Sequence, residues 1–73
     1  MPKLPALSPK KLVKILLKNG FYIHHQTGSH INLRHTTNNS LHVVIPYHNR
    51  DLAPKTLKSI ILQADISLED LLK

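Results

Sequence analysis

Apolar residues recur with a helical spacing in the first twenty residues of the chain. Ser8 can accept hydrogen bonds from free amides, and Pro9 suits the first position of a helix. Apolar side chains then follow at positions 12, 15 and 16, with lysines between and around them. The dipeptide Asn19-Gly20 is typical of a helix end. The pattern therefore predicts a first helix that begins at about Pro9 and ends before Gly20.

From position 21 the spacing becomes alternating, which predicts strands over about residues 21–26, 29–35 and 41–45. Each strand has an apolar and a polar side. The apolar face is expected to hold Phe21, Ile23, His25, Ile31, Leu33, His35, Leu41, Val43 and Ile45. The opposite face is expected to hold Tyr22, His24, Gln26, His30, Asn32, Arg34, His42 and Val44. We interpret the two histidines on the apolar face as packing residues at its edge.

The register of the first two strands follows from keeping apolar residues opposite one another, because cross-strand partners share a face. A three-residue loop, Thr27-Gly28-Ser29, pairs Ile23 with Leu33 and Gln26 with His30. A two-residue loop made of the threonine and the glycine would mix the two faces. We therefore expect the three-residue loop, with its glycine at a positive φ.

The loop of residues 36–40 sets the register of the second and third strands in the same way. It pairs Leu33 with Val43, and it places His30 opposite Pro46. His30 is then expected at the end of its strand, next to the residues that follow Pro46.

A second helical pattern begins at Pro54 and runs to about Ala64. A last short turn is indicated by Ser67, with Asp70 three residues on as its capping-box partner. The order is therefore helix, three strands, helix. This order predicts an α+β fold in which a three-stranded antiparallel sheet has both helices on its apolar face, and the histidine-rich face stays open.

The composition fits one domain, which we expect to span residues 1–73 with its core at about 8–72. Such a length is near the lower limit at which one hydrophobic core suffices. The chain has no cysteine, which excludes disulfides and cysteine-based zinc sites. No apolar run approaches the ~20 residues of a membrane span, and the first residues do not resemble a secretory signal. We therefore expect a cytoplasmic protein.

The charge is strongly positive, at +6, and the first fifty residues contain no carboxylate side chain. A surface of one sign favours a polyanionic partner, and nucleic acid is the commonest polyanion in the cytoplasm. A charge that serves only solubility is the alternative. The candidate RNA-binding residues are Arg34, Lys10, Lys14, Lys55 and Lys58, although helix lysines also often form no more than a solvated face.

The distribution of acids decides how the chain could act if it cleaves a bound nucleic acid. Metal-dependent nucleases hold magnesium with clustered carboxylates, and only Asp51 lies outside the acidic tail. Metal-free cleavage is easier on RNA, whose 2′-hydroxyl is a nucleophile beside the phosphate. Histidine can accept or donate the proton near neutral pH. Arg34, on the same face as His30, could contact the phosphate bidentately. One histidine cannot easily both accept and donate a proton in a single step, so a second group is needed. Tyr47, His48 and a lysine are the candidates for this second group.

Other interpretations of the rings compete with this one. A histidine in a strand is usually a polar surface residue. His24, His30 and His42 face the same way and could suggest zinc, but no cysteine or nearby acid favours that. Tyr22 and Tyr47 could stack on bases, but two tyrosines are too few to indicate a stacking platform for a single strand.

Several short motifs, in this order and spacing, resemble those of the HicA toxin family. They are Gly20-Phe21, Gly28-Ser29-His30, Pro46-Tyr47-His48, Pro54-Lys55-Thr56-Leu57, Gln63-Ala64 and the closing residues 66–71. The resemblance extends from about Ser8 to Leu72. Two positions depart from it, since Lys55 and Asp65 stand where the family usually has glycine. Both departures concern helix ends.

The resemblance implies a double-stranded-RNA-binding-domain-like α-β-β-β-α fold and a toxin of a type II toxin–antitoxin system. It implies ribonuclease activity on messenger RNA, inhibition by a HicB-type antitoxin, and His30 as the catalytic residue. We expect no cofactor, because the chain has no carboxylate cluster that could hold magnesium. We take Gly28, Ser29, Tyr47 and His48 as candidates that support His30. A non-catalytic RNA-binding module of the same fold is the alternative function.

Overall fold

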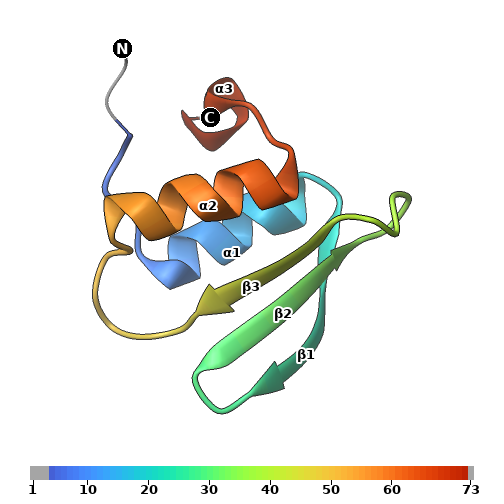
Figure 1. Cartoon of the computed structure of the whole chain (residues 1–73), viewed down its shortest axis with the longest axis horizontal. Helices are drawn as coiled ribbons and strands as arrows, with labels where there is room; N and C mark the ends of the chain where they lie inside the picture. Colours follow the sequence, from blue (N-terminus) through green and yellow to red (C-terminus); the bar gives the residue numbers. More distant parts are fainter. Residues whose placement is uncertain (1–3, 73) are drawn as a thin grey trace.

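The structure is a computed structural model that describes residues 4–72, so the ends of the expected domain, residues 1–3 and 73, lie outside the described residues. Its elements confirm the predicted order of a helix, three antiparallel strands and a helix (Figure 1). They are α1 (Pro9–Lys18), β1 (Phe21–Thr27), β2 (His30–His35), β3 (His42–Pro46), α2 (Pro54–Ala64) and α3 (Leu68–Leu72). None of the helices within the described residues is long and apolar enough to cross a bilayer.

The ends of α1 are those that the sequence predicts. Ser8 precedes the helix with extended backbone, and its Oγ accepts a hydrogen bond from the amide of Lys11 at 3.3 Å. Pro9 occupies the first turn, where the missing amide hydrogen costs nothing. Asn19 closes the helix, and Gly20 turns the chain into β1 with a φ of +90°.

Helix α2 begins and ends at the residues predicted for it, Pro54 and Ala64. Its last turn is closed by Asp65 in the left-handed conformation, with φ 54° and ψ 41°. Aspartate tolerates this region better than most residues, so the fold accommodates it where the resembled family usually has glycine. Ser67 then accepts a hydrogen bond from the amide of Asp70 at 3.1 Å, which confirms the expected cap of the final short helix.

The register of β2 and β3 is also as predicted. Strand β2 lies between β1 and β3 in the sheet. Leu33 pairs with Val43, and His30 pairs with Pro46 at the end of the ladder. His30 therefore occupies the expected position at the start of the central strand.

The predicted register of β1 and β2 is wrong at its loop end. Ile23 pairs with Leu33 as expected, but His30 pairs with Thr27 rather than with Gln26. A β-bulge between Ile23 and His25 inserts one extra residue, His24, into β1. The bulge leaves a two-residue loop of Gly28 and Ser29.

The bulge reverses the faces of the residues that follow it. His25 pairs with Asn32 and therefore shares the open face, not the apolar face predicted for it. Gln26 pairs with Ile31 and moves to the helix side. Ile23, predicted on the apolar face, is 46% exposed because it lies on the edge strand beside the bulge.

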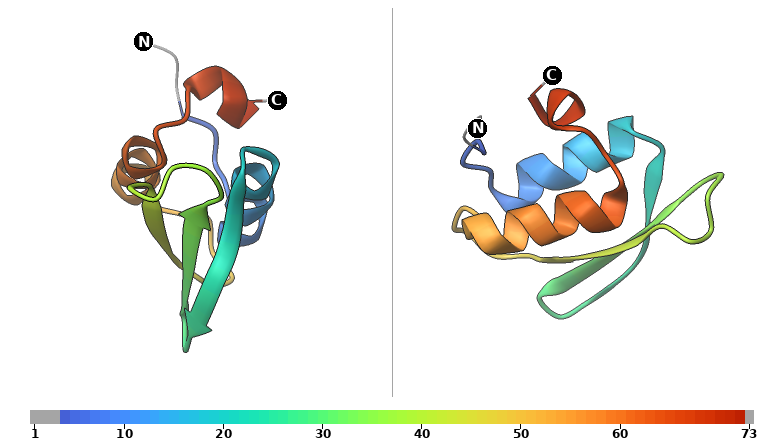
Figure 2. Two further views of the ribbon diagram at one scale, coloured as in Figure 1. Left: turned by 90° about the vertical axis from the view of Figure 1, so that its right-hand side faces the viewer. Right: turned by 45° about the horizontal axis from the view of Figure 1, so that its top comes forward.

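The two long helices lie side by side over one face of the sheet and run in the same direction (Figures 1 and 2). The amide of Leu52 donates a hydrogen bond to the carbonyl of Leu7 at 2.8 Å, which ties together the segments that precede the two helices. Both helices therefore begin at the same end of the molecule, where β3 also ends. Among residues 4–72, no helix covers the other face of the sheet.

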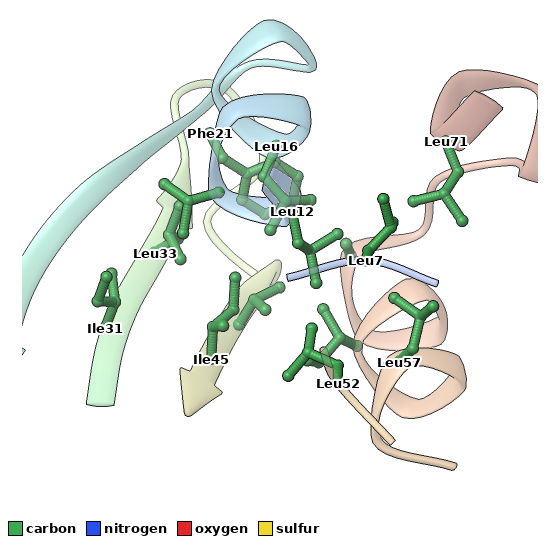
Figure 3. Packing of buried hydrophobic residues seen from close by; sticks show 14 residues of the cluster. Leu7, Leu12, Leu16, Phe21, Ile31, Leu33, Ile45, Leu52, Leu57 and Leu71 are labelled. Atoms are coloured by element: carbon green, nitrogen blue, oxygen red, sulfur yellow. The ribbon is translucent and has the colours of Figure 1, made fainter. Parts of the chain in front are cut away.

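The core lies between the helices and the apolar face of the sheet, as Figure 3 shows. Leu33, Val43 and Ile45 from the sheet are fully buried, as are Leu12 and Leu16 from α1. The other buried apolar residues are Leu7, Val13, Phe21, Ile31, Leu52, Leu57, Ile60, Ala64 and Leu71. Among the residues predicted for the apolar side, His35 is half-buried at the edge of this core, as expected.

Candidate functional site

His30 is the first residue of β2, and its side chain is exposed. The residue after it, Ile31, is buried, so alternation directs His30 away from the helices and onto the open face. Gly28, at the tip of the hairpin, has a φ of +53° and no atom within 4 Å of the position of a Cβ. The tip of the hairpin beside His30 is therefore uncrowded at Gly28.

The loop after β3 is fixed against this hairpin. Pro46, opposite His30, has no amide hydrogen, and the next amide along the chain, that of Tyr47, donates a hydrogen bond to the carbonyl of Ser29. The backbone of Tyr47 is thereby held against the residue that precedes His30. The structure thus brings together four of the predicted site residues, from Gly28 to His30 and Tyr47.

His48 lies one residue beyond this anchored backbone and is exposed. Its Nδ1 accepts a hydrogen bond from the amide of Arg50 at 3.2 Å. This bond assigns the acceptor role to Nδ1, so the neutral ring carries its proton on Nε2. The arrangement limits the ways in which the ring of His48 can turn, and it leaves Nε2 available to a ligand.

Arg34 lies on the open face with His30 but at the opposite end of β2. It pairs with Tyr22 of β1 and with His42 of β3. It lies four positions after His30, which corresponds to roughly 13 Å along the strand. Arg34 is therefore suited to a neighbouring group of a long anionic ligand, and not to the same phosphate as His30.

The lysines predicted to bind RNA lie on the helix layer instead. Lys10 and Lys14 are exposed on α1, and Lys55 and Lys58 are exposed on α2. Neither helix has an acid in its first turn, so the positive ends of two parallel helix dipoles add to these charges. The candidate cations therefore form two groups on opposite sides of the sheet.

Two residues of the open face were not predicted to belong to a functional site. Asn32 is only 9% exposed, and its Oδ1 lies 3.2 Å from Nε2 of His42. His25 joins this face through the bulge, and its Nδ1 lies 2.8 Å from Nδ1 of His24. The adjacent polar pair at positions 24 and 25 interrupts the alternation, and that interruption is the only trace of the bulge in the sequence.

The histidines do not gather into a metal site. Within residues 4–72, no group of three or more histidine, cysteine, aspartate or glutamate side chains could hold a metal ion. The strand register explains why two of the three histidines that could suggest zinc, His30 and His42, do not lie together. His30 pairs with Pro46 and His42 pairs with Arg34, so the two rings lie at opposite ends of the sheet.

Comparison with known proteins identifies the family of the chain. No curated protein is significantly similar to the chain. The profile of a family described as the HicA toxin of bacterial toxin–antitoxin systems matches residues 9–66. The matched segment runs from the first residue of α1 through all three strands and α2, and it includes His30. The chain therefore belongs to the HicA family of toxins of bacterial toxin–antitoxin systems.

Proposed function

We propose that this toxin is an endoribonuclease that cleaves messenger RNA with His30 as its catalytic residue and without a metal ion. The observation that carries the proposal is the position of His30, which is exposed at the end of a hairpin whose backbone is anchored through Ser29 to Tyr47. A fixed backbone and an accessible imidazole are what proton transfer to a bound polymer requires.

The proposed reaction uses the nucleophile that RNA itself carries. His30 removes the proton of a 2′-hydroxyl, and the 2′ oxygen attacks the adjacent phosphorus. The bond from phosphorus to the 5′ oxygen breaks, and this oxygen takes a proton from a second group, for which Tyr47, His48 and a lysine are the candidates. The products are a cyclic 2′,3′-phosphate and a 5′-hydroxyl. One imidazole cannot easily supply both transfers in one step, so a second group is required.

The distribution of acids supports a mechanism without magnesium. Of the four carboxylate side chains, only Asp51 lies outside the last nine residues. The three strands contain none, so His30 has no acidic neighbour within the sheet that could hold a divalent cation near the scissile phosphate.

The positive charge supports an acidic protein as the inhibitor, and we propose a HicB-type antitoxin in the cytoplasm. Electrostatic steering between a basic toxin and an acidic partner raises the association rate. Such a partner inhibits by covering His30, which needs no conformational change in the toxin.

A non-catalytic RNA-binding module is the second candidate function, and the paired helix ends favour it. Lys10, Lys14, Lys55 and Lys58 lie on two helices that begin at the same end of the molecule. Such basic helix ends can contact the phosphates of an RNA duplex by shape alone. This binding function would not require a histidine at the hairpin.

The experiment that separates the two functions replaces His30 by alanine. Wild-type protein is expected to arrest growth when its expression is induced in bacteria, and to cleave RNA when purified. His30→Ala is expected to abolish both effects and to keep the wild-type circular dichroism, because truncating an exposed side chain removes no volume from the core. Asn39→Ala, in the exposed loop between β2 and β3, is the control and should retain cleavage. Cleavage by folded His30→Ala protein at the wild-type rate would show that His30 is not catalytic.

A further inference from the structure

Three aromatic and imidazole rings follow one another along β1. The ring centroids of Tyr22 and His24 are 6.5 Å apart with a tilt of 54°. Those of His24 and His25 are 5.0 Å apart in an edge-to-face arrangement, and their Nδ1 atoms are 2.8 Å apart. The three side chains therefore form a continuous row, which we call the ring row.

The ring row lies on the open face of the sheet, opposite α1 and α2. Tyr22 pairs with Arg34, and His25 pairs with Asn32, and cross-strand partners share a face. His24 occupies the bulge and contacts the rings on both sides of it. An uninterrupted strand would direct consecutive residues to opposite faces, so the bulge is what adds the third ring to the row.

The middle of the open face offers a fixed polar pair beside these rings. Asn32 lies at the centre of β2 and is almost buried, with its Oδ1 held by His42 at 3.2 Å. Tyr22 remains 42% exposed and Val44 39% exposed, so flat and apolar surface stays accessible on either side of that pair. The face therefore combines exposed ring and apolar surface with a polar centre.

The charge of the face selects the ligand. Arg34 belongs to it, and none of the three strands contains an aspartate or a glutamate. Stacking surface together with a cation and no anion suits a polymer of flat bases and phosphates. A duplex already stacks its bases on one another and offers only its grooves and backbone. An unpaired strand exposes base faces that rings can stack against.

We propose that the open face of the sheet binds single-stranded RNA and leads it to His30. Bases stack on Tyr22 and on the histidines of the ring row, and the backbone follows β2 from Arg34 to His30. This inference rests on the proposed ribonuclease function, and it adds to that function the substrate's conformation and the surface that selects it. The basic helix ends lie on the other side of the sheet and are not part of this surface.

The test measures RNA binding by His30→Ala protein, which leaves the RNA intact. The probes are a short unstructured RNA strand and the same strand annealed to its complement. The single strand is expected to bind more tightly than the duplex. Tyr22→Ala should weaken single-strand binding by roughly 5- to 150-fold, the range that corresponds to the loss of one stacked base. Tyr22→Phe keeps the ring and should restore binding.

Arg34→Gln should also weaken binding and should lower the slope of log affinity against log salt by about 0.7, the contribution of one phosphate contact on a single strand. The matched controls lie away from the open face. Leu62→Ala removes an apolar side chain that is 72% exposed on α2, and Lys18→Gln removes one charge in the last turn of α1. Neither control should change the single-strand affinity by as much as its open-face counterpart.

Equal affinity for the duplex, or an unchanged affinity in Tyr22→Ala, would overturn the proposal. If Tyr22→Ala leaves RNA binding intact and instead abolishes antitoxin binding, the open face is a protein surface and the proposal is wrong. Single-strand binding that depends on Tyr22, in a wild-type protein that does not cleave RNA, would support the binding surface and contradict the ribonuclease. Cleavage that requires His30 but does not depend on Tyr22 would support the ribonuclease function and contradict the proposed binding surface.

Discussion

The ring of His35 closes over Gly20, with its Nε2 atom 2.7 Å from the position that a Cβ on Gly20 would take. The same Nε2 lies 3.2 Å from the carbonyl oxygen of Asn19, while Nδ1 accepts hydrogen bonds from the amides of Thr37 and Asn38. Two amide donors at Nδ1 require the proton on Nε2, which can then donate to Asn19. The ring of His35 thus joins the end of α1 to the loop that follows β2.

The first prediction concerns the two glycines. Gly20→Ala should destabilise the fold by at least about 2 kcal/mol, because it combines a φ of +90° with a clash against the His35 ring. The free energy of unfolding in urea measures this loss. Gly28→Ala has a φ of +53° and free space around its Cβ, so it should cost only about 1 kcal/mol.

Gly28 is the matched control for this prediction, because it shares the positive φ of Gly20 and lacks the neighbour. Gly28→Asn should recover part of the loss, since asparagine tolerates the left-handed region. Equal destabilisation by the two alanine variants would mean that backbone strain alone matters and that contact with His35 has no effect.

The second prediction concerns the centre of the core. Leu33 lies in the middle strand, is fully buried and faces the helices. Leu33→Ala should therefore lower the free energy of unfolding by about 2–5 kcal/mol. Leu62→Ala makes the same chemical change at a side chain that is 72% exposed, and it should cost no more than about 0.5 kcal/mol. Urea unfolding of both variants measures the difference. Similar losses would contradict the assignment of the core.

The second half of the sheet could be predicted from the sequence because its alternation is complete. A slip of one residue would move every apolar side chain of one strand to the other face, so the burial of both Leu33 and Val43 excludes that slip, and the length of the loop after β2 sets the register. The helix ends were predictable for a similar reason. Ser8, Pro9 and Gly20 each meet a local need of the backbone that does not depend on the rest of the fold.

The bulge in β1 could not be predicted in this way. His24 and His25 are both polar, so neither face is penalised when the register shifts at this point. The correct pairing of Ile23 with Leu33 is compatible with a three-residue loop, and equally with a bulge and a two-residue loop. The choice between the two depends on the loop geometry. It decides on which face His25 lies, and therefore how many rings the open face carries.

The candidate site shows the same division. The position of His30 opposite Pro46 followed from alternation, whereas the hydrogen bond from Tyr47 to Ser29 depends on how the loop after β3 folds back. The separation of Lys55 and Lys58 from Arg34, by contrast, was predictable, because the sequence placed both helices on the apolar face and Arg34 on the open face.

The third prediction is that cleavage needs no divalent metal ion. RNA cleavage by the purified toxin should keep its rate in excess chelator, with a change of less than about twofold, because no carboxylate cluster accompanies His30. The assay follows cleavage of a labelled RNA with and without chelator. Added magnesium, at constant ionic strength, serves as the control for effects on RNA structure. Loss of cleavage in chelator, restored by magnesium, would contradict the metal-free mechanism.

The fourth prediction concerns inhibition, which we expect to work by occlusion. A partner on the open face can cover both His30 and Arg34, whereas Lys55 and Lys58 lie on α2, on the far side of the sheet. One partner can bury all four only by reaching around an edge of the sheet. RNA and an antitoxin should therefore compete for His30→Ala toxin, with saturating antitoxin lowering the apparent RNA affinity by about tenfold or more.

Charge reversal tells which side of the sheet the antitoxin covers. Arg34→Glu should weaken both RNA and an acidic antitoxin by about tenfold or more, because like charges brought together cost several kcal/mol. The paired change of Lys55 and Lys58 to glutamate should weaken the antitoxin to the same extent only if the partner reaches around the sheet. Lys18→Glu, in the last turn of α1, is the control for net charge. A ternary complex of toxin, antitoxin and RNA with undiminished affinities would show that inhibition does not act by covering the site.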